Sequence, residues 1–151
     1  MGQRTLEITD VSSPLKTAFT ISRGAKTSAD TIRVTLRQGQ AVGRGECVPY
    51  PRYGETQTGV HAAIEALRAQ IEGGLSREAL QTAMPAGAAR CAVDCALWDL
   101  EAKLTGTPVW KLAGLPEPKP IETAVTVSLD TADAMAEAAR STPSRLLKLK
   151  L

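Results

Sequence analysis

Two lysines close to the last residue, Lys148 and Lys150, have the type and spacing needed for proton transfer. The segment Arg145–Leu151 alternates, and successive side chains of a β-strand point to opposite faces, so both amines share one face while three leucines share the other. Two residues along a strand span about 6.6 Å. At an effective dielectric constant of about 20, two ammonium charges at this separation repel by roughly 2.5 kcal/mol, and one of them gives up its proton more readily, as a general base must. The alternative is that the lysines protect an exposed strand edge or lie on a solvated face.

The two lysines end a predicted β-α-β unit. Ile121–Leu129 has the pattern of a strand, Thr131–Ser141 that of an alanine-rich helix capped by Asp130 or Thr131, and Leu146–Leu151 that of a second strand. The right-handed crossover of such a unit requires a parallel sheet, and two parallel strands cannot bury themselves. We therefore expect this unit to open an α/β sheet or barrel whose other strands lie outside the chain.

A proline-rich linker, Pro116–Pro120, predicts the domain boundary. We expect one domain in residues 1–115 and the incomplete start of another in residues 116–151. The strongest predicted helix, Ala86–Leu104, is apolar over much of its circumference. We interpret the aspartates on its exposed strip as structural, because each has a basic i,i+4 partner: Arg90 with Asp94, and Asp99 with Lys103.

Three short antiparallel strands are predicted at the start of the chain. Thr5–Val11 alternates and is ended by Ser12–Pro14. Phe19–Asp30 mixes some apolar character with Gly and Ser, which favours a strand end leading into a mobile loop. Thr31–Arg37 and Ala41–Val48 are predicted to form a hairpin around the turn between them.

A stiff loop and two helices follow the hairpin. Pro49–Thr56 contains two prolines and two tyrosines, so it is either a surface loop held by tyrosine packing or the wall of a pocket. Thr58–Ile71 has a helical apolar stripe closed by Gly73 and Gly74, and Ser76 is the expected N-cap of a second, short helix.

Composition excludes several classes of function. The net charge is +2 and only 3% of the residues are aromatic, so we expect neither nucleic-acid binding nor a base-stacking surface. No apolar run approaches the roughly 18 residues of a membrane span, and the first residues lack the apolar core of a signal peptide, which predicts a cytoplasmic location. We expect Cys47, Cys91 and Cys95 to be reduced, buried thiols, and we disfavour a zinc site shared with His61.

The order of these elements and four motifs resemble the muconate-lactonising subgroup of the enolase superfamily over the whole chain. The helix segment Ala92–Lys103, which contains Asp-Cys-Ala-Leu-Trp-Asp-Leu, and the following Gly106–Pro108 are shared widely and indicate the fold more than the substrate. Gly45–Glu55 and Pro85–Arg90 are more specific and look like the dipeptide epimerases, in particular those acting on L-Ala-D/L-Glu.

The resemblance implies a fold and a reaction. The fold is an α+β enolase-like capping domain, with a three-stranded antiparallel meander plus helices, followed by the first β-α-β of a modified TIM barrel with its active site at the carboxyl ends of the strands. The reaction is a 1,1-proton transfer in murein peptide metabolism. Mg²⁺ binds the substrate carboxylate, one lysine removes the α-proton, an enediolate forms, and a lysine on the opposite face returns the proton, as enolase-superfamily sites do in general.

By the resemblance, each role falls on a matching position of this chain. Lys150 matches the catalytic acid/base, and Lys148 matches the partner that binds the substrate carboxylate and assists the base. Thr126 matches a substrate-binding position on the first barrel strand. Arg23 with its loop matches the specificity loop of the cap. There it either binds the side-chain carboxylate of a substrate glutamate through charge-assisted hydrogen bonds or is an ordinary solvated arginine.

The chain departs from the family pattern in one respect. The family's acidic metal ligands and its second catalytic lysine have no matching residues in this chain. We therefore expect the Mg²⁺ ligands outside the chain and predict that the 151-residue polypeptide alone is inactive. A homo-oligomer or a second chain could complete the barrel. The other functions left open are muconate cycloisomerase, o-succinylbenzoate synthase, N-acyl amino acid racemase and a non-catalytic capping or interaction module.

Overall fold

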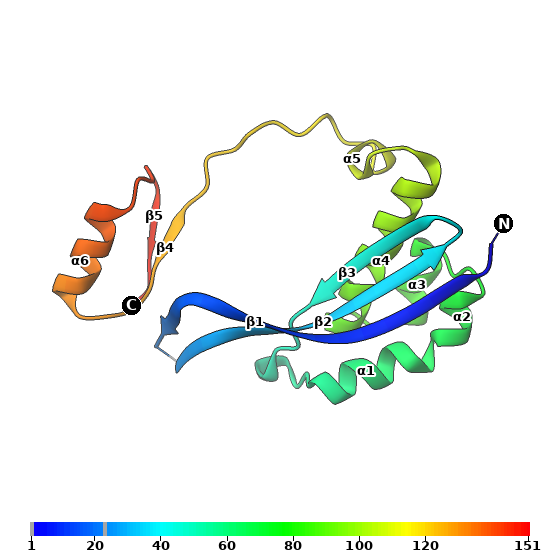
Figure 1. Ribbon diagram of the computed structural model, residues 1–151, viewed down its shortest axis with the longest axis horizontal. Helices are drawn as coiled ribbons and strands as arrows, with labels where there is room; N and C mark the ends of the chain where they lie inside the picture. The colour runs from blue at the N-terminus through cyan, green and yellow to red at the C-terminus, as the bar shows by residue number, and fades with distance from the viewer. Residues whose placement is uncertain (1, 23) are drawn as a thin grey trace. The chain divides into compact units, whose positions relative to one another are not determined.

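The computed structural model describes residues 2–22 and 24–151, and these residues form two compact units (Figure 1). One unit contains residues 1–11 and 30–117, and the other contains residues 12–29 and 118–151. No helix in the described ranges combines the length and the apolarity that crossing a bilayer requires.

The three-stranded sheet has the order β1-β2-β3, with β1 at Arg4–Ile21, β2 at Gly24–Gln38 and β3 at Ala41–Cys47. β2 and β3 are antiparallel and in register from Ile32 opposite Cys47 to Gln38 opposite Ala41. The predicted hairpin is therefore confirmed.

The first two strands are longer than the sequence predicted. Pro14 was expected to end the first strand, but β1 continues through it to Ile21. Because β1 is an edge strand, the missing N–H of Pro14 can face away from β2 without breaking the ladder. Phe19 does lie near a strand end, as predicted, because β1 ends at Ile21. The mobile loop expected to follow it as far as Asp30 is wrong, since β2 already begins at Gly24.

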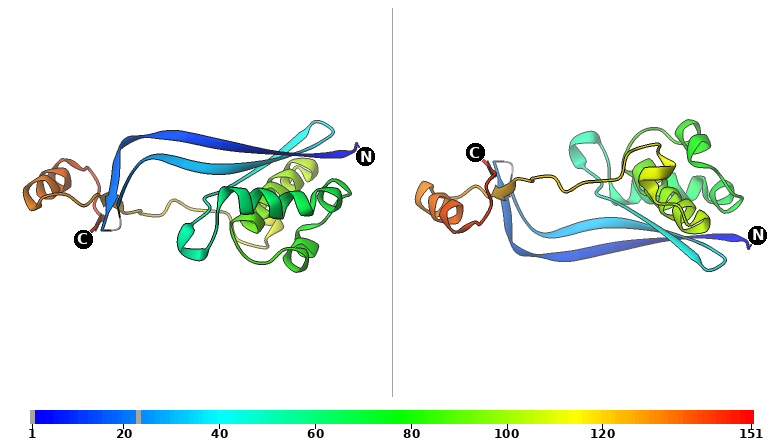
Figure 2. Two further views of the ribbon diagram at one scale, coloured as in Figure 1. Left: turned by 90° about the horizontal axis from the view of Figure 1, so that it is seen from below. Right: turned by 90° about the horizontal axis from the view of Figure 1, so that it is seen from above.

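Helices cover one face of this sheet, as Figure 2 shows for α1 (Gln57–Ala66) and α4 (Ala88–Thr105). The stripe predicted over residues 58–71 is divided at Leu67, whose backbone leaves the helical region. Ser76 is the predicted N-cap and accepts a hydrogen bond from the Ala79 N–H at 3.2 Å. The helices are α1 (Gln57–Ala66), α2 (Arg68–Glu72), α3 (Arg77–Ala83), α4 (Ala88–Thr105) and α5 (Val109–Leu112), with a 3₁₀ turn at Pro51–Tyr53.

α4 packs directly on β3, and two glycines make this approach possible. A Cβ on Gly43 would lie 2.3 Å from the Ala96 carbonyl oxygen, and one on Gly45 would lie 2.0 Å from the Ala92 carbonyl oxygen. The helix backbone thus occupies the space that side chains would fill at these strand positions. The largest fully buried side chains form the core around this contact: Ile32, Val34, Leu36, Ile64, Ile71, Leu80, Val93 and Leu100.

One of the two ion pairs predicted on α4 is present. The Lys103 ammonium lies 2.7 Å from the Asp99 carboxylate. Arg90 instead donates to the carbonyl oxygens of Gln81 and Met84, and Asp94 accepts from the Gln81 side chain. The prediction for Arg90 was wrong because helical spacing cannot reveal the carbonyl groups that α3 leaves unpaired at its end.

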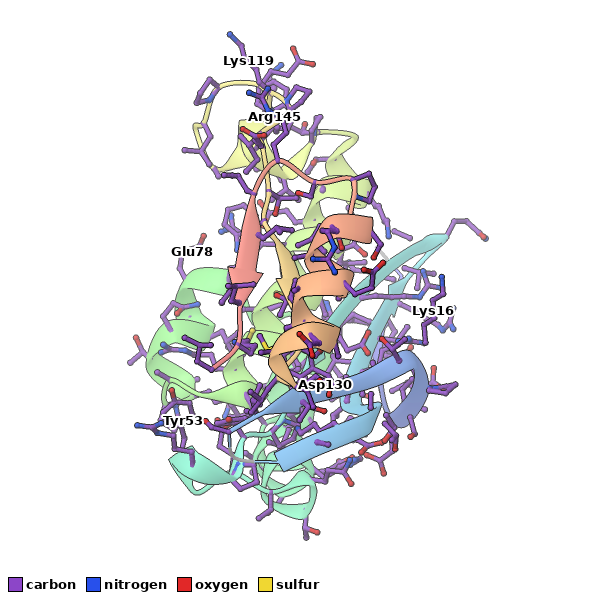
Figure 3. All side chains as sticks on the ribbon, turned by 90° about the vertical axis from the view of Figure 1, so that its left-hand side faces the viewer. Lys16, Tyr53, Glu78, Lys119, Asp130 and Arg145 are labelled. Atoms are coloured by element: carbon purple, nitrogen blue, oxygen red, sulfur yellow. The ribbon has the colours of Figure 1, made fainter. Side chains whose placement is uncertain are left out.

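The second unit contains the predicted β-α-β. β4 (Val125–Val127) and β5 (Leu147–Leu149) are parallel, with α6 (Ala132–Ser141) between them in the chain (Figure 1). Thr131 caps α6 by accepting from the Ala134 N–H at 3.3 Å, and Asp130 precedes it (Figure 3). Both strands are shorter than predicted, because each has a single neighbour in the two-stranded sheet to define its ladder.

Candidate active site

The register of the parallel strands brings Thr126 and Lys148 side by side. They are directly paired across β4 and β5, between the pairs Val125–Leu147 and Val127–Leu149. Paired residues of neighbouring strands project from the same face of a sheet at a spacing of about 4.8 Å. A hydroxyl group and an amine therefore lie together on one face.

Lys150 continues this face one residue beyond the end of β5. Its backbone N–H donates to the Val127 carbonyl oxygen at 3.1 Å, which extends the strand pairing. The side chain is half-buried, whereas that of Lys148 is exposed. Its ammonium nitrogen lies 5.8 Å from the centroid of the Phe19 ring, within the range of a cation–π interaction.

The end of the β1–β2 hairpin contacts the chain just after the carboxyl end of β4, close to where Lys150 is hydrogen-bonded to Val127. The Leu129 N–H donates to the Thr20 carbonyl oxygen at 3.1 Å. Thr20 thus contacts the segment after β4 and Phe19 contacts Lys150, although both come from a part of the sequence more than a hundred residues away. Arg23, predicted to bind substrate from this hairpin, lies outside the described residues.

The sequence did not single out Phe19 or Thr20. Their segment was interpreted as a strand end before a mobile loop, and alternation cannot reveal that such a segment contacts the strands of a second sheet. The one available signal was that Phe19 is the chain's only phenylalanine and stands in a polar hairpin.

The lysine-bearing face does not by itself fit a magnesium ion. Mg²⁺ requires near-octahedral oxygen coordination, usually with one or two carboxylates. The positions that alternate with Thr126 and Lys148 on this face are Ala124, Ser128, Leu146 and Lys150, none of which is acidic. In the described ranges, no group of three or more His, Cys, Asp or Glu side chains is arranged to hold a metal.

The loop before α1 lines an open hollow of about 560 Å³. Its two tyrosine rings pack with centroids 5.7 Å apart, and Tyr53 remains 76% exposed (Figure 3). The Glu55 carboxylate connects this loop to the start of α4. It accepts hydrogen bonds from the Ala88 N–H at 2.7 Å and from the Tyr50 N–H at 2.9 Å. These two backbone donors lower the pKa of Glu55.

The three cysteines differ in their surroundings. All are free thiols, but only Cys47 is buried, so the prediction of burial was wrong for Cys91 and Cys95, whose side chains are exposed. Burial raises the pKa of the Cys47 thiol to about 11. His61 forms a 2.8 Å hydrogen bond with Asp10.

Comparison with known proteins supports the fold assigned from these elements. A family model described as "Mandelate racemase / muconate lactonizing enzyme, N-terminal domain" matches residues 3–114. The L-Ala-D/L-Glu epimerase of Escherichia coli (strain K12) is 44% identical over 151 residues, covering 98% of this chain and 47% of that protein. The chain thus spans about half the length of the curated relatives it matches.

Solved structures give the same result. An enolase family member from Agrobacterium tumefaciens with homology to dipeptide epimerases, with bound sodium and L-Ala-L-Glu, is 48% identical with a TM-score of 0.90, covering 97% of this chain and 45% of that one. The dipeptide epimerase of Cytophaga hutchinsonii, complexed with Mg and D-Ala-L-Val, is 27% identical with a TM-score of 0.85, covering 99% and 44%. These likenesses confirm the predicted α+β enolase-like fold.

Proposed function

The chain belongs to the mandelate racemase / muconate lactonizing enzyme N-terminal domain family, and on this premise we propose that it is the amino-terminal part of a Mg²⁺-dependent dipeptide epimerase. The reaction inverts the α-carbon of the carboxy-terminal residue of a dipeptide, with L-Ala-D/L-Glu as the substrate. Two similarities support this choice. The chain is 44% identical to a protein described as L-Ala-D/L-Glu epimerase and 48% identical to a protein whose structure contains L-Ala-L-Glu. Peptides derived from murein are the expected source of the substrate, and the cytoplasm is the expected place of the reaction.

The observation that carries the proposal is the shared face of Thr126, Lys148 and Lys150. A 1,1-proton transfer requires a base within reach of the α-carbon and positive charge near the carboxylate next to it. Two amines two residues apart on one strand meet both requirements, because one can bind the carboxylate while the other faces the α-proton.

Each side chain has a distinct part in this proposal. Lys150, half-buried and held near Phe19, takes the α-proton from one face and returns it in the reverse direction. Lys148, more exposed, binds the substrate carboxylate, and its charge assists the base. Thr126, paired with Lys148, offers a hydroxyl group to the substrate backbone.

Mg²⁺ is part of the proposed enzyme, but its ligands are not assigned to this chain. The lysine-bearing face lacks carboxylates, so we assign the metal ligands and the opposite acid/base to the part of a full-length enzyme that lies beyond the matched half. The residues described here act through proton transfer and carboxylate binding alone.

The test is turnover by a full-length protein that carries this chain. L-Ala-L-Glu incubated with the protein and Mg²⁺ is expected to yield L-Ala-D-Glu. Chiral chromatography measures the two epimers. N-succinyl amino acids and muconate, offered in parallel at equal concentration, are the matched controls for the related reactions. Conversion of either control without epimerisation of any dipeptide would replace the proposed activity with that of another subgroup member.

A further inference from the structure

We propose that Phe19 is a positioning residue for Lys150, holding its ammonium group through the face of the aromatic ring. The inference rests on the proposed role of Lys150 as acid/base. Its direct basis is the 5.8 Å distance between the Lys150 Nζ and the ring centroid, since cations within about 6 Å of an aromatic centroid are attracted by the ring quadrupole.

Both partners of this contact are fixed through their backbones. Thr20, next to Phe19, accepts the Leu129 N–H at 3.1 Å, and Lys150 donates its own N–H to Val127 at 3.1 Å. Val127 is the last residue of β4 and Leu129 lies two residues after it, so both hydrogen bonds are made to the same short segment of backbone. A lysine side chain has four rotatable bonds and loses much entropy when held in one place. The ring supplies an attraction that favours one placement.

The contact distinguishes the two lysines. Lys148 and Lys150 share a face, but within the described part of the chain the aromatic contact belongs to Lys150, which is also the less exposed of the two. An aromatic face attracts an ammonium ion and has little attraction for a neutral amine. Lys150 becomes an ammonium ion when it takes the substrate proton, so the ring stabilises the state reached by abstraction and should act on kcat more than on KM.

Progressive fluorination of residue 19 tests the electrostatic part of this inference. In the full-length protein, Phe19 is replaced by 4-fluoro-, 3,5-difluoro- and 3,4,5-trifluorophenylalanine, which keep the ring's shape and weaken its negative face. Exchange of the α-proton in D₂O is measured from each epimer of Ala-Glu, after Lys150→Ala has identified the epimer that Lys150 deprotonates. We expect exchange from that epimer to fall stepwise by about two- to fivefold in total, with exchange from the other epimer and KM unchanged.

Two controls separate this role from a structural one. Thr17→Ala, two residues earlier on the same strand and exposed, should leave both exchange rates unaltered. Phe19→Leu keeps an apolar side chain but removes the quadrupole, and should match the trifluoro variant. A flat fluorination series, or equal losses from both epimers, would show that Phe19 only fills space and would overturn the inference while leaving the proposed activity in place.

A readout that needs no activity completes the test. Lysine protons over an aromatic ring are shifted upfield by its ring current, so the Lys150 Hε resonance, assigned with Lys150→Arg, should move downfield in Phe19→Leu. An unshifted resonance in the wild-type protein would overturn the contact itself. A shifted resonance in a protein that epimerises no dipeptide would instead support the contact and refute the proposed function.

Discussion

Gly45→Ala should destabilise the first unit strongly, because α4 leaves no room for a methyl group at this strand position. The added Cβ would lie 2.0 Å from the Ala92 carbonyl oxygen, 2.6 Å from the Ala96 nitrogen and 2.9 Å from the Cys95 Cβ. Ordinary contacts begin near 3.4 Å, so helix and strand must separate by roughly 1.4 Å where they now touch.

The expected cost lies at the upper end for overpacking. Overpacked cores lose typically about 1–3 kcal/mol, and here the obstructing atoms belong to the helix backbone, which cannot rotate aside. α4 also supplies a large share of the buried core, so its displacement loosens many contacts at once. We expect a loss of about 3 kcal/mol in the free energy of unfolding, or roughly 10 °C in Tm.

Urea unfolding followed by circular dichroism measures this loss. Gly39→Ala is the matched control, because a Cβ there meets nothing within 4 Å and only its φ of 59° is unfavourable, which costs about 1 kcal/mol. Combining Gly45→Ala with Cys95→Gly should restore little stability, since the Ala92 carbonyl oxygen remains. If Gly45→Ala costs no more than Gly39→Ala, the close approach of α4 to β3 is not the reason for glycine at position 45.

Three further predictions concern single side chains. The Ala88 and Tyr50 N–H groups lower the pKa of Glu55 in the folded state. The stability that this carboxylate contributes is therefore present at pH values above the ordinary pKa of glutamate and is lost as the pH falls through the lowered pKa of the folded state. Acid titration of the free energy of unfolding should therefore be less steep for Glu55→Gln than for wild type, and equal slopes would contradict the two hydrogen bonds. Cys47, whose pKa is raised to about 11, should resist an aromatic disulfide reagent at pH 8 while the exposed Cys91 reacts, so Cys47→Ala should leave the number of fast-reacting thiols unchanged; a lower number would mean that Cys47 is accessible. Arg23→Met should lower kcat/KM of the full-length protein for L-Ala-L-Glu by roughly 10- to 100-fold and leave L-Ala-L-Ala nearly untouched, because the second dipeptide offers no side-chain carboxylate; equal losses would show that Arg23 does not bind that carboxylate.

Local chemistry explains which parts of the fold the sequence predicted. The caps at Ser76 and Thr131 were predictable because a hydroxyl before a helical stripe satisfies orphan N–H groups two or three residues later. The passage of β1 through Pro14 was not, because proline ends a strand only where its N–H would be needed, and edge position is a property of the whole sheet.

The same distinction applies to the candidate site. Alternation was enough to put Lys148 and Lys150 on one face, and the register then pairs Lys148 with Thr126. Phe19 was missed because its contact with Lys150 joins segments separated by most of the chain, and no local pattern records such a contact.

Proton exchange from the substrate by Lys150 tests the central claim most directly. The full-length protein is incubated in D₂O with Mg²⁺ and either L-Ala-L-Glu or L-Ala-D-Glu, and the glutamate α-proton signal is followed by NMR. With Lys150→Ala, exchange should be abolished from one epimer and retained from the other, because the base on the opposite face is intact. Circular dichroism establishes that the variant is folded. Unchanged exchange from both epimers in a folded Lys150→Ala protein would contradict the assignment of Lys150 as the acid/base.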